Sequence, residues 1–344
     1  MNNAQLHRAR RLLCALQDHI LATLLAARKK SSASFSRVAA VTAADTIYQV
    51  DRVGEEAIIA WFERNWPRAW PVELVMEGIE DGESVTFPRG TPLARTVFKC
   101  ILDPIDGTRN LMHDKRSAWT LAALAPQRGA RTNLADLVVA AMTELPTSKQ
   151  WRADQLSAVR GGGARRLVAE AIDVRSGTRK KFSPRPSPAR DFQHGFASLV
   201  KFFPEGKSLL ARVEEELWGE LYGLGRPGAP VVFDDQYLTT GGQIYELLVG
   251  HDRMVGDLRP LALAKLGFGS SLVCHPYDIC TELLLTEAGG IVEMPGGDGC
   301  GSLGGGPLRG RLDTTSPVAW VGYANAELAR QVRPILRRLI KKYF

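Results

Sequence analysis

One nine-residue run, Leu102–Asn110, constrains this chain more than any other part of its sequence. The apolar residues in front of it predict a largely buried β-strand (Val97, Phe98, Cys100, Ile101 and Leu102). Because Pro104 has no backbone N–H, the ladder of strand hydrogen bonds cannot continue past Asp103. The sequence therefore predicts a buried strand that ends at two carboxylates, Asp103 and Asp106.

These residue types suit a site for metal ions and phosphate. Asp103 and Asp106, three positions apart across a proline turn, can converge on one or two hard cations. Gly107 lets the backbone approach an anion closely, and the hydroxyl of Thr108 can orient a water molecule. An acidic turn in which Asp103 caps and Asp106 faces solvent is the alternative, but the whole run is more specific than two spaced acids.

A second segment, His275–Val292, has the pattern of a helix followed by a strand. Asp278 lies just after a proline, where the helix is expected to begin, and Gly289-Gly290 is expected to end it. Taken alone, Asp278 is most simply a helix cap. Beside the first motif, a role in the same acidic site is the better interpretation.

Together these segments resemble the inositol monophosphatase family, the metal-dependent and lithium-sensitive phosphatases that include fructose bisphosphatases. The first run matches the metal motif D-P-I-D-G-T-x-N of the family, and Tyr277-Asp278 with Glu287–Gly290 matches the second motif, where tryptophan usually precedes the aspartate. The glycine-rich turn Gly161–Gly163 also has a counterpart there. The resemblance implies a layered α-β-α-β-α sandwich of the inositol monophosphatase and fructose bisphosphatase type.

The resemblance also implies roles for individual residues. Two or three Mg²⁺ ions would be held by the following groups: Glu77, Asp103, the carbonyl of Ile105, Asp106 and Asp278. Thr108, with Asp51 and Glu77, would align the attacking water. Glu80 is an alternative to Glu77, because the loop after it has no strong anchor in the sequence. Substrate contacts would come from a second set: Gly107, Thr108, Arg109, Gly241, Gly242 and Asp278.

The implied activity is a magnesium-dependent phosphomonoesterase that hydrolyses a small phosphorylated metabolite, either similar to inositol monophosphate or a sugar phosphate. A nucleotidase for 3′-phosphoadenosine 5′-phosphate with the same fold is the alternative. Arg109 stands where the family often has threonine, which hints at a doubly charged substrate. A binding protein without activity would require lost ligands, whereas this sequence keeps its acids.

The composition of the 344 residues is that of an ordinary globular protein, with 45% hydrophobic and 24% charged residues. The net charge of +7 is dispersed, so a solvated basic face is favoured over binding to nucleic acid. No apolar run is long enough for a membrane span, and the first 28 residues predict an amphipathic helix rather than a signal peptide. Five widely spaced cysteines predict reduced thiols and a cytoplasmic location. A homodimer is compatible with the resemblance.

The order of predicted elements divides the chain into two subdomains. Residues 1–190 are expected to form an α+β subdomain with most of the metal ligands, and residues 191–344 an α/β subdomain with Asp278. Arg179–Arg190 is expected to be a surface connection, Val231–Phe233 a strand, and Gly296–Gly310 a mobile loop.

Overall fold

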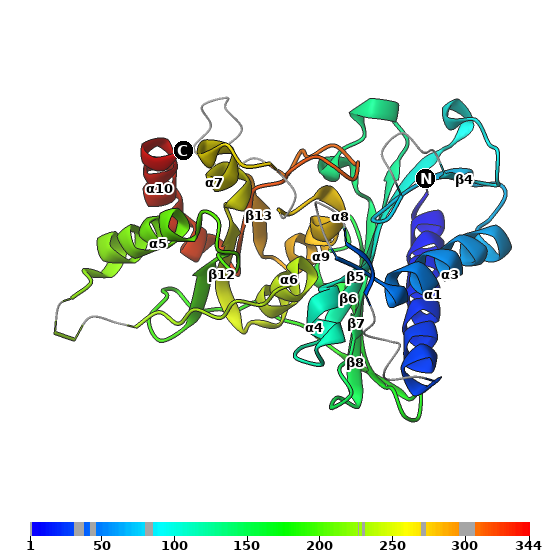
Figure 1. Cartoon of the computed structure of the whole chain (residues 1–344), viewed down its shortest axis with the longest axis horizontal. Coiled ribbons are helices and arrows are strands. Elements are labelled where there is room, and N and C mark those ends of the chain that lie inside the picture. The colour runs from blue at the N-terminus through cyan, green and yellow to red at the C-terminus, as the bar shows by residue number, and fades with distance from the viewer. Residues whose placement is uncertain are drawn as a thin grey trace.

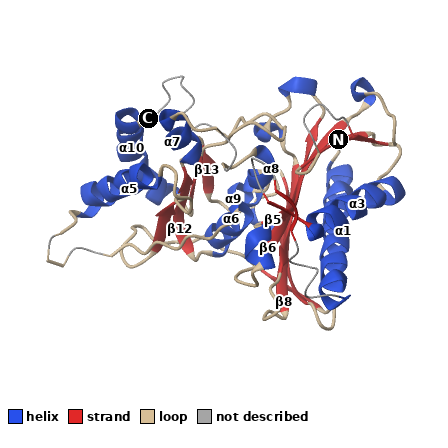
Figure 2. Cartoon of the chain, viewed as in Figure 1, coloured by secondary structure: helices blue, strands red, loops and turns tan. Residues whose placement is uncertain are grey.

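The computed structural model describes residues 2–30, 38–41, 46–79, 85–225, 227–228, 231–269, 273–295 and 307–344. In this part of the chain, an eight-stranded and a four-stranded β-sheet alternate with three layers of helices (Figures 1 and 2). The predicted α-β-α-β-α sandwich is therefore confirmed.

The larger sheet has eight strands in the order β10-β9-β8-β7-β6-β5-β3-β4. Their bounds are β3 Val72–Met76, β4 Val85–Phe87, β5 Phe98–Asp106, β6 Ala118–Pro126, β7 Val139–Leu145, β8 Arg152–Val159, β9 Val168–Asp173 and β10 Arg179–Phe182. Only β3 and β5 pair in parallel in this sheet. A separate two-stranded hairpin is formed by β1 (Val38–Val41) and β2 (Thr46–Tyr48). Four short 3₁₀ helices lie in the connections, at Leu93–Arg95, Gly129–Arg131, Leu134–Asp136 and Ala164–Arg166.

Two helices, α1 (Asn3–Lys30) and α3 (Gln49–Asn65), cover the outer face of this sheet (Figure 1). The contact is mostly apolar, but a fully buried glutamine of α1 fixes its position along the strands. The amide of Gln17 donates to the carbonyl oxygens of Thr120 and Ala141 at 3.1 and 2.8 Å, and accepts a hydrogen bond from the hydroxyl of Thr143 at 2.9 Å. Because an unpaired buried amide is costly, these bonds favour a single register of α1 on the sheet.

The middle layer lies between the two sheets and contains α6 (Thr240–Val249), α8 (Pro276–Ile279) and α9 (Glu282–Glu287). The short helix α4 (Thr108–Met112) follows β5 directly. At the end of α9, the carboxylate of Glu287 accepts hydrogen bonds from the backbone N–H groups of Gly161 and Gly163 at 2.7 and 2.6 Å. The glycine-rich turn and the second sequence motif therefore meet in one structural contact.

The smaller sheet has the order β11-β12-β14-β13, and β11 and β12 are its parallel pair. The bounds of its strands are β11 Phe196–Leu199, β12 Asp252–Asp257, β13 Ile291–Glu293 and β14 Trp320–Tyr323. Its outer helices are α5 (Lys207–Tyr222), α7 (Arg259–Leu266) and α10 (Ala326–Tyr343), which share a third apolar core with the sheet.

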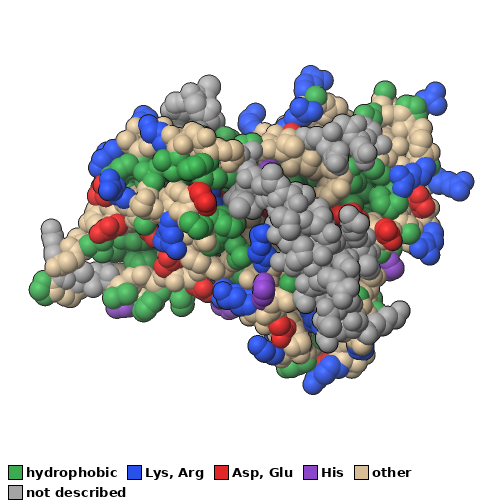
Figure 3. All heavy atoms as spheres, in the orientation of Figure 1, with side chains coloured by type: hydrophobic (Ala, Val, Ile, Leu, Met, Phe, Trp, Pro, Cys, Tyr) green, Lys and Arg blue, Asp and Glu red, His purple; other side chains and the backbone are tan. Residues whose placement is uncertain are grey.

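The basic residues of α10 mostly have acidic partners within the chain. Arg333 binds Glu293, Arg338 binds Glu220, and Lys342 binds Glu216. On the face shown in Figure 3, Lys and Arg side chains lie at both ends of the molecule and along its lower edge. This distribution agrees with a solvated basic face, while the absence of a nucleic-acid partner stays a prediction. Among the described residues, no helix is long and apolar enough to cross a membrane.

Several expected elements differ from the structure. Arg179–Phe182, expected in a surface connection, is the edge strand β10, whose basic side chains face solvent while its backbone pairs with β9. Val231–Phe233 forms only an isolated bridge, through Phe233 to Phe196. The expected Asp278 helix is two short helices, α8 and α9. The sequence did not predict α7 or the strands β1, β2, β4 and β9. Residues 296–306 of the expected mobile loop lie outside the described residues. The division at residue 190 stays a prediction.

Candidate metal centre

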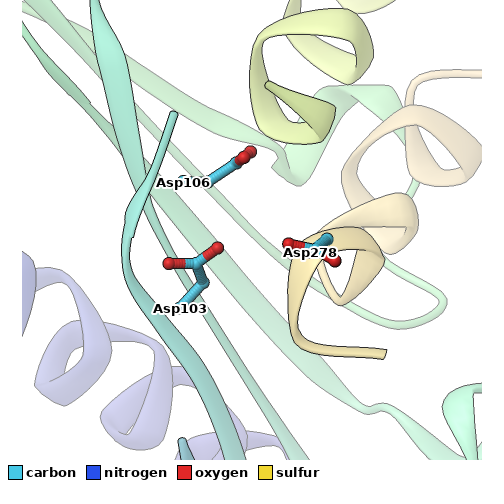
Figure 4. Close-up of side chains that lie close together, drawn as sticks. All are labelled: Asp103, Asp106 and Asp278. Atoms are coloured by element: carbon cyan, nitrogen blue, oxygen red, sulfur yellow. The ribbon is translucent and has the colours of Figure 1, made fainter. Parts of the chain in front are cut away.

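Three carboxylates from distant parts of the sequence converge between the larger sheet and the middle layer of helices. Asp103 and Asp106 belong to β5, and Asp278 lies in the first turn of α8. Each offers an oxygen within 4.8 Å of the other two, and Figure 4 shows the three side chains facing one another. Two of the carboxylates are buried, and Asp278 is partly exposed.

An irregularity in β5 turns both of its acids toward the same side. Asp103 pairs with Leu121 of β6 and Asp106 with Trp119, so three steps along β5 correspond to two along β6. In a regular strand, residues three apart point to opposite faces, and a bulge cancels that alternation. The strand thus ends at its two acids, and the ladder with β6 is interrupted between them, both as predicted.

Backbone N–H groups hold the two acids of β5 in place. The N–H of Ile105 donates to Asp103 Oδ1 at 2.9 Å, and the N–H of Gly241 donates to Asp106 Oδ2 at 2.5 Å. Gly241 lies in the first turn of α6, where N–H groups are unpaired and the helix dipole is positive. A Cβ atom at Gly241 would lie 2.6 Å from Leu121 Cδ2, so only glycine lets α6 approach the site this closely.

Asp278 is positioned by its own helix turn. The N–H of His275 donates to Asp278 Oδ2 at 2.5 Å, and His275 Nδ1 lies 3.7 Å from the same oxygen. The ring of Tyr277 stacks on that of His275 with centroids 5.3 Å apart. Tyr277 therefore supports the residue that orients Asp278, which gives the tyrosine of the second motif a packing role.

The electrostatics of the centre favour an added cation. Burial raises the pKa of Asp103 well above its ordinary value, and Glu77, Asp106 and Asp278 raise it further by repulsion. Burial, followed by repulsion from Asp278, raises the pKa of Asp106 to about 8. A divalent cation offsets this crowding, and an all-oxygen donor set suits Mg²⁺. The residues present thus fit the metal that the sequence predicts.

Of the other predicted site residues, some lie beside the three aspartates and some fall outside the described part of the chain. Glu77, just after β3, lies close enough to Asp103 for its charge to raise the pKa of that acid. The hydroxyl of Thr108 donates to the carbonyl oxygen of Ile105 at 2.9 Å, which places both groups beside the two acids of β5. The backbone of Asp51 lies in α3, but its side chain and all of Glu80 lie outside the described residues.

The predicted substrate-contacting residues come from two helix starts. Gly107 has a φ of 91° and immediately precedes α4, and a Cβ there would lie 2.9 Å from Thr239 Cγ2. Arg109 is a partly buried residue of α4. Gly241 is occupied with Asp106, and Gly242 donates to the hydroxyl of Thr239 and packs on Tyr237. Their contacts with a substrate stay predictions.

Sequence reasoning did not identify two groups near the centre. The hydroxyl of Thr239, which caps α6, also stabilises the charged form of Asp106, and Arg259 at the start of α7 lies close enough to Asp278 for that acid to raise its pKa. The proline after Arg259 was a usable signal for a helix start. Nothing in the sequence indicated which element this helix would approach.

The structure is similar to solved structures that share little sequence with it. The extragenic suppressor protein SuhB of Bartonella henselae matches with a TM-score of 0.62 at 16% identity, over 98% of this chain and 100% of that chain. Fructose-1,6-bisphosphatase of Leishmania major matches with a TM-score of 0.63 at 13% identity, over 96% and 93%. A hypothetical protein of Pyrococcus horikoshii, described as having similarities to inositol-1 monophosphatase, matches with a TM-score of 0.57 at 14% identity, over 98% and 99%.

No protein-family model and no curated protein sequence matches this chain. The solved structures show that the chain has the fold of inositol monophosphatases and fructose bisphosphatases. The resemblance inferred from two short motifs is thereby confirmed at the level of the fold.

Proposed function

We propose that this chain is a magnesium-dependent phosphatase that hydrolyses a small phosphorylated metabolite, similar to inositol monophosphate or a sugar phosphate. The observation that carries the proposal is the convergence of Asp103, Asp106 and Asp278 within 4.8 Å of one another. The fold of the chain, which brings these aspartates together, is similar to that of a fructose-1,6-bisphosphatase and to that of a protein described as similar to inositol-1 monophosphatase.

The metal ligands would be the three aspartates together with Glu77 and the carbonyl oxygen of Ile105. Magnesium, when bound, supplies positive charge to the phosphate oxygens and lowers the pKa of a water molecule. The chain's own residues hold the geometry for this chemistry, because backbone N–H groups fix Asp103, Asp106 and Asp278 before any ligand arrives.

Two further groups would position the reactants. The hydroxyl of Thr108 would align the attacking water, together with Asp51 and Glu77. The backbone N–H groups that follow Gly107 open α4 and would receive phosphate oxygens. Gly107 adopts the left-handed conformation that turns the chain from β5 into this helix, which explains why the motif requires glycine.

The test is a phosphate-release screen with magnesium across inositol phosphates, sugar phosphates, fructose 1,6-bisphosphate and 3′-phosphoadenosine 5′-phosphate. We expect turnover of an inositol or sugar phosphate, loss of that turnover with EDTA, recovery with magnesium, and inhibition by lithium. Preference for the nucleotide would replace the proposed substrate class. Turnover that survives exhaustive chelation, or no phosphate release from any substrate, would refute the proposal.

A further inference from the structure

A groove distinct from the metal centre runs along the side of α6. It consists of two adjoining cavities of about 650 and 340 Å³ that share Glu144, Gln150 and Tyr245 in their linings. The α6 groove, as we name it, is bordered by the loop after α4, the β7–β8 loop and the residues that follow β10. Its volume is that of a small-molecule site, and no member of the metal centre lines it.

Aromatic rings line the interior of the groove. Tyr245 packs on Trp119 with ring centroids 4.7 Å apart. The guanidinium of Arg152 lies over the ring of Phe182 at 5.4 Å, and Trp151 at the rim is 53% exposed. These rings offer flat apolar surface to a planar ligand.

The acids of the groove already have donors from the chain. Asp154 receives two hydrogen bonds from Arg152, at 2.7 and 2.8 Å, and one from the hydroxyl of Tyr245 at 2.7 Å. Gln150 donates to Glu144 at 2.9 Å, and His251 Nδ1 lies 2.5 Å from Glu246. A cationic ligand would therefore have to compete with these internal partners.

The basic side chains have fewer partners than the acids. Five basic residues line the groove (Lys115, Arg116, Lys149, Arg152 and Arg185), against three acids (Glu144, Asp154 and Glu246). Lys149 and Arg185 are exposed, and neither forms an ion pair with another described residue within 4.0 Å. The net charge of the lining is thus positive. Lys149 also lies near the carboxylate of Asp114 outside the lining, but neither Lys149 nor Arg185 is held in a close ion pair that a ligand would have to break.

We propose that the α6 groove binds a small aromatic anion, with the ring against Tyr245 and Phe182 and the negative charge between Lys149 and Arg185. The site is separate from the metal centre but joined to it through α6. Gly241 at the start of this helix donates to Asp106, and Tyr245 lies one turn later in the groove. A ligand on Tyr245 would therefore contact the helix that positions a metal ligand.

Calorimetric titration with three probes tests the proposal. 1-Naphthalenesulfonate carries both ring and charge, 1-naphthol carries only the ring, and methanesulfonate only the charge. We expect the first to bind most tightly, and the double variant Lys149→Gln with Arg185→Gln to weaken it about tenfold while leaving 1-naphthol unchanged. Both replaced side chains are exposed, so the fold should not depend on them.

Two matched variants locate the site. Lys180→Gln removes an exposed charge from β10 outside the groove lining and should bind like the wild type. Asp103→Asn should also bind normally, which separates this site from the metal centre and from the proposed phosphatase function. Equal binding of 1-naphthalenesulfonate by the wild type and the double variant would overturn the proposal. So would methanesulfonate binding as tightly as 1-naphthalenesulfonate. A wild-type protein that sediments as a dimer and does not bind 1-naphthalenesulfonate would likewise overturn it, because a second copy of the chain would then close the groove.

Discussion

Buried carboxylates occur in two settings in this molecule, and the settings differ in how their charge is balanced. In the smaller sheet, Asp257 is held by Arg259 with a shortest contact of 2.6 Å, and Glu293 by Arg333 at 2.6 Å. At the metal centre, Asp103 and Asp106 face each other and Asp278, and each of the three carboxylates accepts a hydrogen bond from a backbone N–H group. One region balances its charge internally, and the other concentrates negative charge.

The difference supports the proposal that the acidic centre accepts a cation. A buried charge without a counterion costs several kcal/mol, so a fold that needed only stability would pair these acids as it pairs Asp257. Instead, burial and mutual repulsion raise the pKa values of Asp103 and Asp106. Such raised pKa values are typical of functional sites, where a bound cation can supply the missing positive charge. The same contrast predicts opposite responses to mutation in the two regions.

The largest expected effect is on activity, from Asp103→Asn or Asp278→Asn. Each change removes one charge that the metal requires, and we expect phosphate release to fall more than about a thousandfold, which corresponds to a loss of over about 4 kcal/mol of transition-state stabilisation. Steady-state kinetics with the best substrate from the phosphate-release screen measures this loss. Full activity in either variant would contradict the site assignment.

A stability measurement on the same Asp103→Asn protein tests the comparison itself. Without metal, the variant relieves repulsion among buried acids, so its thermal midpoint should exceed that of the wild type. With excess magnesium the order should reverse, because ligand binding stabilises only the protein that binds it. A variant that is less stable in EDTA would show that Asp103 serves mainly as a structural acceptor.

A smaller effect, on stability, is expected from Arg259→Met in the paired region. The side chains of Arg259 and Asp257 are 9% and 1% exposed, so the change leaves a buried carboxylate without its cation and should cost about 3 to 5 kcal/mol. Urea denaturation measures the loss. The matched control, Arg338→Met, breaks an exposed pair with Glu220 and should cost less than about 1 kcal/mol. Equal losses would mean that burial does not distinguish the two pairs.

The two regions also differ in how far sequence could predict them. Asp103 and Asp106 could be predicted as site residues because they lie in one short run with a proline, a glycine and a threonine hydroxyl. Few other structures require this combination. The convergence of Asp278 with β5 could be predicted only from the family resemblance, since no local pattern connects residues that lie 172 and 175 positions apart. The pairing of Glu287 with the glycine turn could not be derived from spacing at all.

Other parts of the chain carry weaker signals in their residue pattern. Arg179–Phe182 reads as a polar connection because both faces of an edge strand carry exposed side chains, and its pairing is a property of the backbone. The Asp257 and Arg259 pair lies two residues apart, but burial of both side chains appears only when the smaller sheet and α7 are assembled. Local pattern therefore identified the acids of the site, but not the elements against which buried side chains pack.

The smallest expected effect concerns Glu282 of α9. The charge of this carboxylate is only partly balanced, because the nearest described cation, the guanidinium of Arg160, is 4.0 Å away. Burial raises the pKa of Glu282 to about 7 from 4.5, with Arg160 opposing the shift and Glu287 adding to it. A carboxyl whose folded pKa is raised stabilises the fold fully below pH 4.5 and loses that contribution as pH rises through about 7.

Glu282→Gln should therefore match the wild type near pH 4.5 and be more stable than it at pH 8, by on the order of 3 kcal/mol at about 1.4 kcal/mol per pKa unit. Urea denaturation across this pH range measures the difference. Glu63→Gln, which alters an exposed pair with Arg89, is the matched control for replacing a glutamate by glutamine. If Arg160 instead neutralises Glu282 as Arg259 neutralises Asp257, the glutamine variant will be the less stable protein at pH 8. That result would show that Glu282 belongs with the carboxylates that are paired with arginine, and that only the carboxylates of the metal centre lack a balancing charge.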